Sequence, residues 1–263
     1  MRALYTAATG MAAQEMNVQV ISNNIANMRT TGFKRQQVHF QDLLYQDLRR
    51  TGSGTSEQGT RAPSGVEIGT GVKTVSTARA MSQGSITPTE KEFDIAIRGE
   101  GFFRIQMPDG RTAYTRDGGF DLDSEGQIVT KDGYLVDPGI QIPAGARSVS
   151  ISNQGGVQVI VGNEAEPQEV GRLQLARFIN KTGLESIGDN LFLESAASGA
   201  AIEGQPGEEG FGSLQQGFLE EANVNAVTEI SSLIAAQRAY EMNSKVISAA
   251  DQMLTAANQM FRG

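Results

Sequence analysis

The 263-residue chain contains no cysteine and no tryptophan, and the missing cysteine narrows the chemistry open to it. Without a thiol, disulfides, thiolate metal sites and cysteine nucleophiles are all excluded. Hydrophobic residues make up only 39% of the sequence, which is low for one compact globule, whereas 31 glycines indicate many turns and extended loops. The length suffices for one or two domains with a sizeable core.

The chain also lacks an excess of basic residues and any long apolar run. Its formal net charge of −8 argues against nucleic acid or an anionic membrane surface as the main partner. No run approaches the roughly 20 apolar residues of a membrane-spanning helix, so we expect no membrane insertion. Thr6, Thr9 and Gln14 interrupt the stretch that a secretory signal would need. We therefore expect a cytoplasmic chain, or one that leaves the cell without a cleaved signal.

Both ends of the chain carry an apolar residue at every seventh position. The N-terminal stripe consists of Leu4, Met11, Val18 and Ile25. The C-terminal stripe consists of Leu233, Tyr240, Ile247, Leu254 and Phe261. A seven-residue repeat places one side chain per two turns on a single helix stripe, which must be buried against another helix. We predict helices over about residues 2–28, ended by Gly32, and about residues 224–261.

The predicted C-terminal helix carries a second stripe with the same spacing, and this one is polar. Its members are Gln237, Ser244, Asp251 and Asn258. Two interpretations are open: the stripe is an ordinary solvated face, or it borders a water-filled space opposite a packed apolar wall.

Between the two ends the composition changes twice. Residues 38–44 fit either a strand or a short helix, and residues 51–71 are dominated by Gly, Ser and Thr. Such a run cannot bury enough apolar area to fold by itself, so we expect it to be mobile unless neighbouring subunits order it. From residue 72 to about residue 218, turn signals such as Pro108-Asp109-Gly110 recur every 8–12 residues, a spacing that favours antiparallel β structure.

The sequence therefore predicts an α+β protein with a central all-β domain. We expect three parts: residues 1–32 with 224–263 as the helical domain, residues 33–71 as an extended connector, and residues 72–223 as the β domain.

The segment that most resembles a site is a near match to a twelve-residue calcium loop. Its oxygen-bearing side chains are Asp121, Asp123, Glu125 and Asp132. The flanks are typical of strands rather than helices, and an aspartate in the last position is too short for bidentate binding. A solvated hairpin turn, which uses Asp and Gly for its dihedral angles, explains the same residues.

Other motifs are weaker still. Gly99-x-Gly101 lacks the third glycine of a dinucleotide loop and is better explained by a bulge or tight turn. The single histidine, His39, has no companions for a zinc site or a catalytic triad. The carboxylate pairs at residues 208–209 and 220–221 are interpreted as solvated. We predict no catalytic residue, no cofactor and no metal site.

The segment after the N-terminal helix resembles a known signature. The sequence ANMRTTGFKR, at residues 26–35, is similar to the A-N-x-x-T-x-G-F-K/R signature of bacterial flagellar rod and hook proteins. The matching residues are Ala26, Asn27, Thr30, Gly32, Phe33 and Lys34. Residues 93–134 resemble the β-domain motif of this family, and residues 237–254 resemble its C-terminal helix. By length and by its single β domain, the chain is similar to the distal rod subunit or to a proximal rod subunit of similar size. Three stretches, at residues 41–50, 64–73 and 182–192, resemble the distal subunit more.

This resemblance implies a structural subunit rather than an enzyme. The terminal helices would pair as a coiled coil on the inside of a helical polymer, with the β domain outside and the connector stiffening the tube. The polymer would be a hollow drive shaft that transmits torque from motor to hook and conducts exported subunits, so the polar stripe becomes a candidate channel lining. It would lie in the flagellar basal body, as a rod from the periplasm to the outer membrane.

The resemblance also implies partners. They are further copies of the chain, proximal rod subunits, the hook protein, the P- and L-ring bushing proteins, the rod cap and the flagellar type III export apparatus. Two alternatives stay open: a proximal rod subunit of similar size, and a calcium-dependent binding module with oligomerisation helices.

Overall fold

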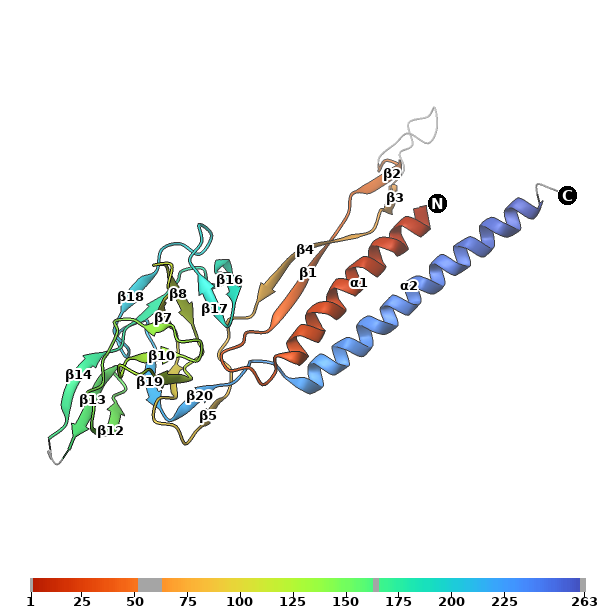
Figure 1. Ribbon diagram of the computed structural model, residues 1–263. Coiled ribbons are helices and arrows are strands. Elements are labelled where there is room, and N and C mark those ends of the chain that lie inside the picture. Colours follow the sequence, from red (N-terminus) through yellow and green to blue (C-terminus); the bar gives the residue numbers. More distant parts are fainter. Residues whose placement is uncertain (1, 52–62, 163–165, 261–263) are drawn as a thin grey trace. The chain divides into compact units, whose positions relative to one another are not determined.

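The computed structural model describes residues 2–51, 63–162 and 166–260 (Figure 1). It is an α+β structure, with one helix near each end of the chain and a β-rich region between them, as predicted. The chain divides into two compact units. The first, here the helical unit, comprises Met1–Ile25, Gln36–Ala78 and Asn225–Gly263; the second, the β unit, comprises Ala26–Arg35 and Arg79–Val224.

Two long helices dominate the helical unit. Helix α1 spans Arg2–Ala26 and helix α2 spans Ala226–Met260. Helix α2 begins at a side-chain cap, because Oδ1 of Asn225 accepts hydrogen bonds from the amides of Val227 at 3.0 Å and Thr228 at 3.2 Å. The predicted extent of α2 is confirmed to within two residues at its start, whereas Phe261 lies outside the described residues.

The predicted extent of the first helix is confirmed to within two residues at its end, but Gly32 does not end it. Helix α1 ends at Ala26 and the chain then turns, with the amide of Thr30 donating to the carbonyl of Asn27 at 3.1 Å. The Thr30 hydroxyl also bonds the Asn27 side chain at 3.1 Å, which favours a turn over further helix. Gly32, with φ of +69°, therefore closes this turn instead of the helix.

Residues 36–79 supply two strand pairs. Strand β1 (Gln36–Asp42) pairs with β4 (Val72–Arg79), and β2 (Tyr45–Arg49) pairs antiparallel with β3 (Val66–Gly69). The open choice for residues 38–44 is thus resolved in favour of strand for its first part. Of the stretch expected to be mobile, residues 52–62 lie outside the described structure.

The β unit is built around one nine-stranded sheet, in which every described register is antiparallel. Its main path runs β16-β17-β8-β7-β11-β10-β9, with β15 paired to β7 and β18 paired to β15. The members are β7 (Phe102–Gln106), β8 (Thr112–Thr115), β9 (Phe120–Leu122), β10 (Ile128–Thr130), β11 (Leu135–Val136), β15 (Leu175–Arg177), β16 (Glu185–Gly188), β17 (Leu191–Leu193) and β18 (Ile202–Gly204).

Three smaller groups of strands complete the unit. A three-stranded sheet has the order β12 (Ala146–Ile151), β13 (Gly156–Val161), β14 (Gln168–Arg172). Strand β6 (Ile95–Arg98) pairs with β19 (Ser213–Gln216), and β5 (Ile86–Pro88) pairs with β20 (Phe218–Glu220). A single 3-10 turn, η1, lies at Lys181–Gly183. The predicted antiparallel β architecture is confirmed for this region.

Two apolar clusters fill the β unit. Successive side chains of β7 point to opposite faces of the sheet, and this alternation explains why there are two. Phe103 and Ile105 enter the larger cluster, where the Phe103 ring packs edge-on against Phe120 at 5.0 Å. Phe102 points the other way, into a smaller cluster with Tyr114 and four further apolar side chains that include Phe192. Each fully buried side chain of this size stabilises the fold by about 1.5–3 kcal/mol, so the unit has a complete core of its own.

Candidate functional site

The helical unit exposes most of the large apolar side chains that face solvent in the described structure. Five of the exposed ones belong to the β unit, namely Met28, Leu122, Ile179, Ile187 and Ile202. The others lie in the helical unit, among them Leu44 at 87% and Met260 at 81% exposed. Contiguous exposed apolar surface marks a site of association. The helical unit is therefore the candidate assembly surface.

On helix α1, the predicted stripe lies at the margin of the buried face. Leu4, Met11, Val18 and Ile25 are each half-buried. The fully buried positions are Ala7, Ala13, Val20, Ile21 and Asn24. The buried face of α1 is thus centred beside the seven-residue stripe. The stripe itself leaves part of its apolar area exposed to solvent.

Helix α2 shows the same offset. Leu233 and Ile247 are half-buried, whereas Tyr240 is 44% and Leu254 is 41% exposed. The buried positions are Glu229, Ala236 and Ala250, which follow a neighbouring line of the helix. Phe261, the last member of the predicted stripe, lies outside the described residues.

The polar stripe of α2 lies to one side of the buried line, because its positions follow those of the line by one residue. Gln237, Ser244, Asp251 and Asn258 are all exposed. Exposure in one chain fits both a solvated face and a channel lining, so the assignment of this stripe stays a prediction.

Small and polar residues lie where the two helices contact each other. A β-carbon added to Gly10 would stand 2.9 Å from Nδ2 of Asn243, so a side chain at this position of α1 would require the Asn243 side chain to move. Farther along, Nδ2 of Asn24 donates a hydrogen bond to Oε2 of Glu229 at 3.2 Å, and both residues are 1% exposed.

Asn24 also ties α1 to strand β1. Its Nδ2 donates to the carbonyl oxygen of Gln36 at 2.9 Å, and its Oδ1 accepts from the Gln36 amide at 2.9 Å. The side-chain amide thus pairs with the Gln36 backbone much as a neighbouring strand would. Asn24 of α1 thus contacts both β1 and α2. Its directional hydrogen bonds favour one register of these three elements at a point where apolar packing alone would allow slippage.

The six residues of the family signature fall into two groups. Ala26 is exposed, and Asn27, Thr30 and Phe33 are half-buried. Gly32 and Lys34 are buried, and both contact the returning chain near Glu220: the amide of Gly32 donates to the Glu220 carbonyl at 2.8 Å. The signature therefore belongs to a junction between the N-terminal and C-terminal segments of the β unit.

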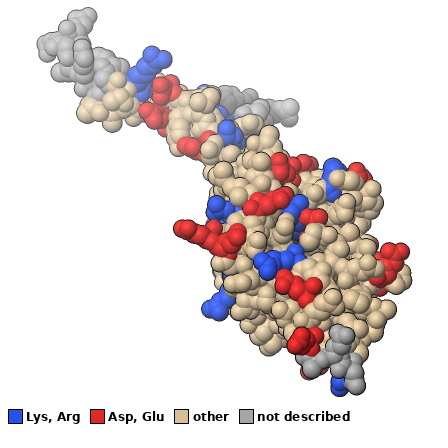
Figure 2. All heavy atoms as spheres, turned by 90° about the vertical axis from the view of Figure 1, so that its left-hand side faces the viewer, with Lys and Arg blue, Asp and Glu red and all other residues tan. Residues whose placement is uncertain are grey.

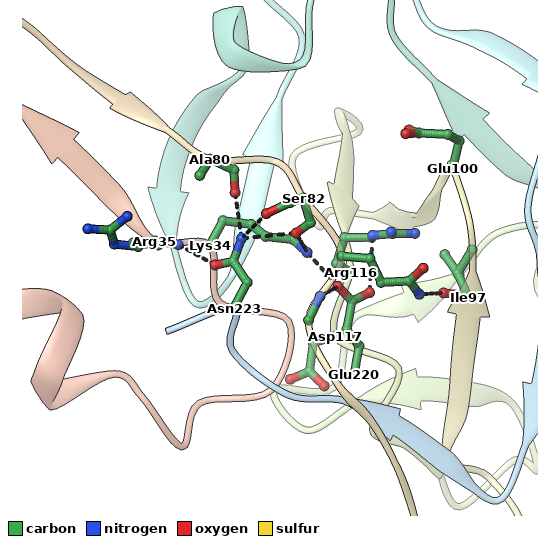
Figure 3. A network of polar contacts seen from close by, with 12 residues as sticks. Lys34, Arg35, Ala80, Ser82, Ile97, Glu100, Arg116, Asp117, Glu220 and Asn223 are labelled. Atoms are coloured by element: carbon green, nitrogen blue, oxygen red, sulfur yellow. Dashed lines mark hydrogen bonds and ion pairs between the residues drawn. The ribbon is translucent and has the colours of Figure 1, made fainter. Parts of the chain in front are cut away.

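The centre of this junction is a buried ionic triad, Lys34, Glu220 and Arg116 (Figure 3). Nζ of Lys34 lies 2.5 Å from Oε1 of Glu220, and Nε of Arg116 lies 3.3 Å from Oε2. None of the three residues is more than 6% exposed. Glu220 had been interpreted from sequence as a solvated carboxylate, and that interpretation is wrong: successive residues of a strand point to opposite sides, and Glu220 points inward.

Hydrogen bonds from the backbone complete the triad. Nζ of Lys34 donates to the carbonyl of Ser82 at 3.0 Å, and the amide of Gly84 donates to Oε1 of Glu220 at 2.9 Å. Arg116 donates to the carbonyls of Gly99 at 2.7 Å and Gly101 at 2.9 Å. These partners satisfy Lys34, Arg116 and Oε1 of Glu220, which would otherwise be costly to bury. Oε2 of Glu220 is buried without a hydrogen bond and faces only the charge of Arg116.

Burial governs the ionisation of the two bases. Burial lowers the pKa of Lys34 below its ordinary value of 10.5, and the charge of Glu220 together with its hydrogen bond opposes this shift. Burial likewise lowers the pKa of Arg116, again opposed by Glu220. Removal of the carboxylate would therefore leave two desolvated cations side by side.

The segment that resembled a calcium loop is a hairpin turn. Strands β9 and β10 pair on either side of it, and Oδ1 of Asp123 accepts hydrogen bonds from the amides of Glu125 and Gln127, both at 2.8 Å. Asp121 instead lies 3.8 Å from Lys91 in an ion pair. Within residues 2–51, 63–162 and 166–260, no three acidic or histidine side chains gather as a metal site would require.

The Gly99-x-Gly101 segment is the tight turn that the sequence predicted. It connects β6 with β7, and its glycines have φ of +110° and +139°. His39 is exposed on β1, and the other predicted carboxylate pair, Glu208-Glu209, is exposed as expected.

The face of the β unit in Figure 2 carries basic and acidic side chains interspersed rather than gathered by sign. Such a surface lacks the basic stripe of a nucleic-acid-binding protein. Neither described helix combines the length and the apolar character needed to cross a membrane.

Three protein-family models match the chain. The model described as "Flagella basal body rod protein" matches residues 4–34, and "Flagellar basal body rod FlgEFG protein C-terminal" matches residues 215–260. Between them, "Flagellar hook protein FlgE/F/G D1 domain" matches residues 96–159. Nearly all of both long helices, most of the signature and the strands from β7 to β12 thus fall within matched regions.

Full-length relatives show the same similarity. The chain is 59% identical over 260 residues to the flagellar basal-body rod protein FlgG of Caulobacter vibrioides, covering 99% of both chains. It is 47% identical to the FlgG of Borreliella burgdorferi, covering 100% of this chain and 99% of the relative. It is 40% identical to that of Bacillus subtilis, covering 97% of each.

Proposed function

The chain belongs to the family of bacterial flagellar basal-body rod proteins, and we propose that it forms the distal rod of the flagellum. In this role it is a structural protein of the basal body and not an enzyme. Its copies polymerise helically into a hollow drive shaft, which transmits torque from motor to hook and conducts exported subunits.

One observation carries the proposal: most of the exposed large apolar side chains lie on the helical unit, whereas the β unit encloses most of its own in a core. Exposed residues of α2 include Val227 at 75% and Met253 at 66%, and Leu44 lies between the strands β1 and β2 at 87%. A monomer gains nothing from such surfaces, whereas a polymer buries them between neighbours. A head-to-tail contact that does not close on itself makes a helical filament of this kind.

In the assembled rod, the two helices pair as an inner coiled coil, and the stripes that begin at Leu4 and Leu233 pack against neighbouring copies. Their half-buried state in one chain leaves apolar area available for those contacts. Ordering a helical residue costs roughly 1–2 kcal/mol of conformational entropy. Contacts with several neighbours at the growing tip offset this cost, so assembly is favoured there over spontaneous association in solution.

The polar stripe formed by Gln237, Ser244, Asp251 and Asn258 lines the central channel in this proposal. A conduit for unfolded chains should bind them weakly, and an exposed stripe with one charge in four positions meets that requirement. The extended connector at residues 33–71, with the Gly/Ser-rich part at residues 51–71, lies between subunits and stiffens the shaft.

As a rod subunit, the chain assembles with other components of the flagellum. We propose that these are proximal rod subunits, the hook protein, the P- and L-ring bushing proteins, the rod cap and the type III export apparatus. The distal rod then spans the distance from the periplasm to the outer membrane.

The test is electron microscopy of basal bodies from a strain that lacks this chain. Rods that stop short, without a hook and without an outer bushing around a finished shaft, are expected. A strain without any rod would instead favour the role of a proximal subunit, and complete rods with hooks would refute both roles.

A further inference from the structure

Hydrogen bonds within the β unit join separate chain segments close to the positions where the chain passes into the helical unit. The chain crosses between the two units after residues 25, 35, 78 and 224. Three of these crossings lie within two residues of Arg35, Ala80 and Asn223, and Figure 3 shows Asn223 in contact with both Arg35 and Ala80. All three belong to the β unit.

A single side-chain amide makes most of these contacts. Oδ1 of Asn223 accepts a hydrogen bond from the Arg35 amide at 2.7 Å, and Nδ2 donates to the carbonyl of Ala80 at 2.8 Å. Nδ2 also lies 2.9 Å from the carbonyl and 3.0 Å from the hydroxyl of Ser82. The Ala80 amide in turn donates to the Arg35 carbonyl at 2.8 Å. We call this group, with Arg35, Ala80, Ser82 and Asn223, the Asn223 clamp.

The ionic triad joins the same three segments a second time, deeper in the unit. Lys34 precedes Arg35 and contacts Ser82 and Glu220, and Glu220 also accepts from the amide of Gly84. Each of the three segments, at residues 34–35, 80–84 and 220–223, is therefore bonded to the other two at two successive points. The first is the clamp around the half-buried Asn223, and the second is the fully buried Lys34–Glu220 pair.

We infer that the Asn223 clamp, with the triad behind it, is the element through which the β unit takes up mechanical load. Force on the β unit passes through the covalent chain at its crossings. With the three segments bonded to one another, force on one segment loads the contacts of all three together, whereas separate segments would detach one after another. This inference rests on the proposed function, because only a drive shaft subjects the unit to sustained torque.

The donor character of the Asn223 side chain makes the inference testable. In Asn223→Asp, the carboxylate still accepts from the Arg35 amide but cannot donate to the carbonyls of Ala80 and Ser82, and its charge faces their oxygens. Asn180→Asp is a matched control, because Nδ2 of Asn180 donates to one carbonyl, that of Ala197 at 2.9 Å, away from the crossings.

The experiment replaces the chromosomal copy and measures rotation of single flagella at low and high viscous load, together with rod length by electron microscopy. Asn223→Asp is expected to build rods of normal length that rotate at low load and stop or break at high load. Asn180→Asp should match the wild type at both loads. If Asn223→Asp fails to assemble, Ser82→Ala, which removes only the hydroxyl contact, takes its place in the same measurements.

An engineered disulfide provides the second part of the experiment. Since the chain has no cysteine, the pair R35C/A80C adds a single possible disulfide across the clamp. The cysteine pair is introduced into the Asn223→Asp chain, or into the Ser82→Ala chain if Asn223→Asp does not assemble. The oxidised pair should restore rotation at high load, and reduction of the disulfide should abolish this restored rotation. Normal rotation of the variant at high load, or no rescue by the disulfide, would overturn the inference while leaving the rod assignment intact.

Discussion

Gly32 packs directly against the backbone of Asp117: a β-carbon on residue 32 would stand 2.6 Å from the Asp117 amide nitrogen. This contact gives the glycine of the family signature a physical role. The residue has to turn with a positive φ and also has to approach another segment more closely than any side chain would permit.

Gly32→Ala is therefore expected to destabilise the β unit more than Gly110→Ala does. Both glycines have positive φ, so each alanine costs roughly 1–2 kcal/mol of backbone strain. Only at residue 32 does the new methyl group also collide with backbone, since nothing lies within 4 Å of the corresponding position at Gly110. Urea unfolding followed by circular dichroism compares the two variants, and equal losses would contradict this account.

Lys34→Ala should lower the free energy of unfolding by roughly 3–5 kcal/mol, because it leaves the Glu220 carboxylate buried with a lost partner. The control is Lys181→Ala, which removes an ion pair with Glu100 whose side chains are 27% and 58% exposed. An exposed pair contributes about 1 kcal/mol or less. A Lys34 variant as stable as the Lys181 variant would show that the triad contributes little to the stability of the unit.

Stability should fall with pH above 10 in a way that depends on Tyr114. Burial raises the pKa of the Tyr114 phenol above its ordinary value of 10.0, and the charge of Glu194 adds to the shift. The unfolded chain then loses the phenolic proton at a lower pH than the folded chain. The associated stability is complete below pH 10 and is lost as the pH rises toward the folded-state pKa.

Tyr114→Phe keeps the edge-on packing against Phe178, 4.8 Å between ring centres in the wild type, and removes the titrating group. Its free energy of unfolding should therefore decline less steeply above pH 10 than that of the wild type. Urea titrations at several alkaline pH values measure both slopes, and parallel slopes would refute the prediction.

Cysteine labelling in assembled rods tests the channel assignment. In a chain without native thiols, Ser244→Cys should react with a maleimide small enough to enter the channel. Ala236→Cys, on the buried line of the same helix and 3% exposed in the wild type, should stay unreactive. If cysteines at all four polar positions resist the probe in the rod, those residues do not line the channel.

Shortening the connector tests its proposed mechanical role. Deletion of part of residues 51–63 should give rods that are more flexible or curved, because the stretch would no longer fill the space between subunits. Electron microscopy of purified basal bodies measures their curvature. Straight, stiff rods from the deletion strain would eliminate this role for the connector.

Local chemistry made the β architecture predictable. At Pro108-Asp109-Gly110, for example, the glycine has φ of +84° and Oδ1 of Asp109 accepts from the Arg111 amide at 3.0 Å, as a turn of this composition requires. The helices were predictable for a similar reason, since a seven-residue repeat is a property of adjacent turns.

Contacts between distant segments escaped prediction. The partner of Glu220 is 186 residues away at Lys34, so the sequence near Glu220 shows only two adjacent acids. The buried line of α2 was missed for a different reason: its members at 229, 236 and 250 are Glu and Ala, which a search for apolar periodicity ignores. The same search could find such lines if small residues were included.

The pairing of Lys34 with Glu220 has a consequence for the time course of folding. Because so long a loop separates the two residues, closing it carries a large entropic cost and is expected to come after the local hairpins have formed. A chain broken off before residue 220 retains the lysine without its carboxylate. Truncated products therefore keep an unfinished junction, whereas complete chains close it.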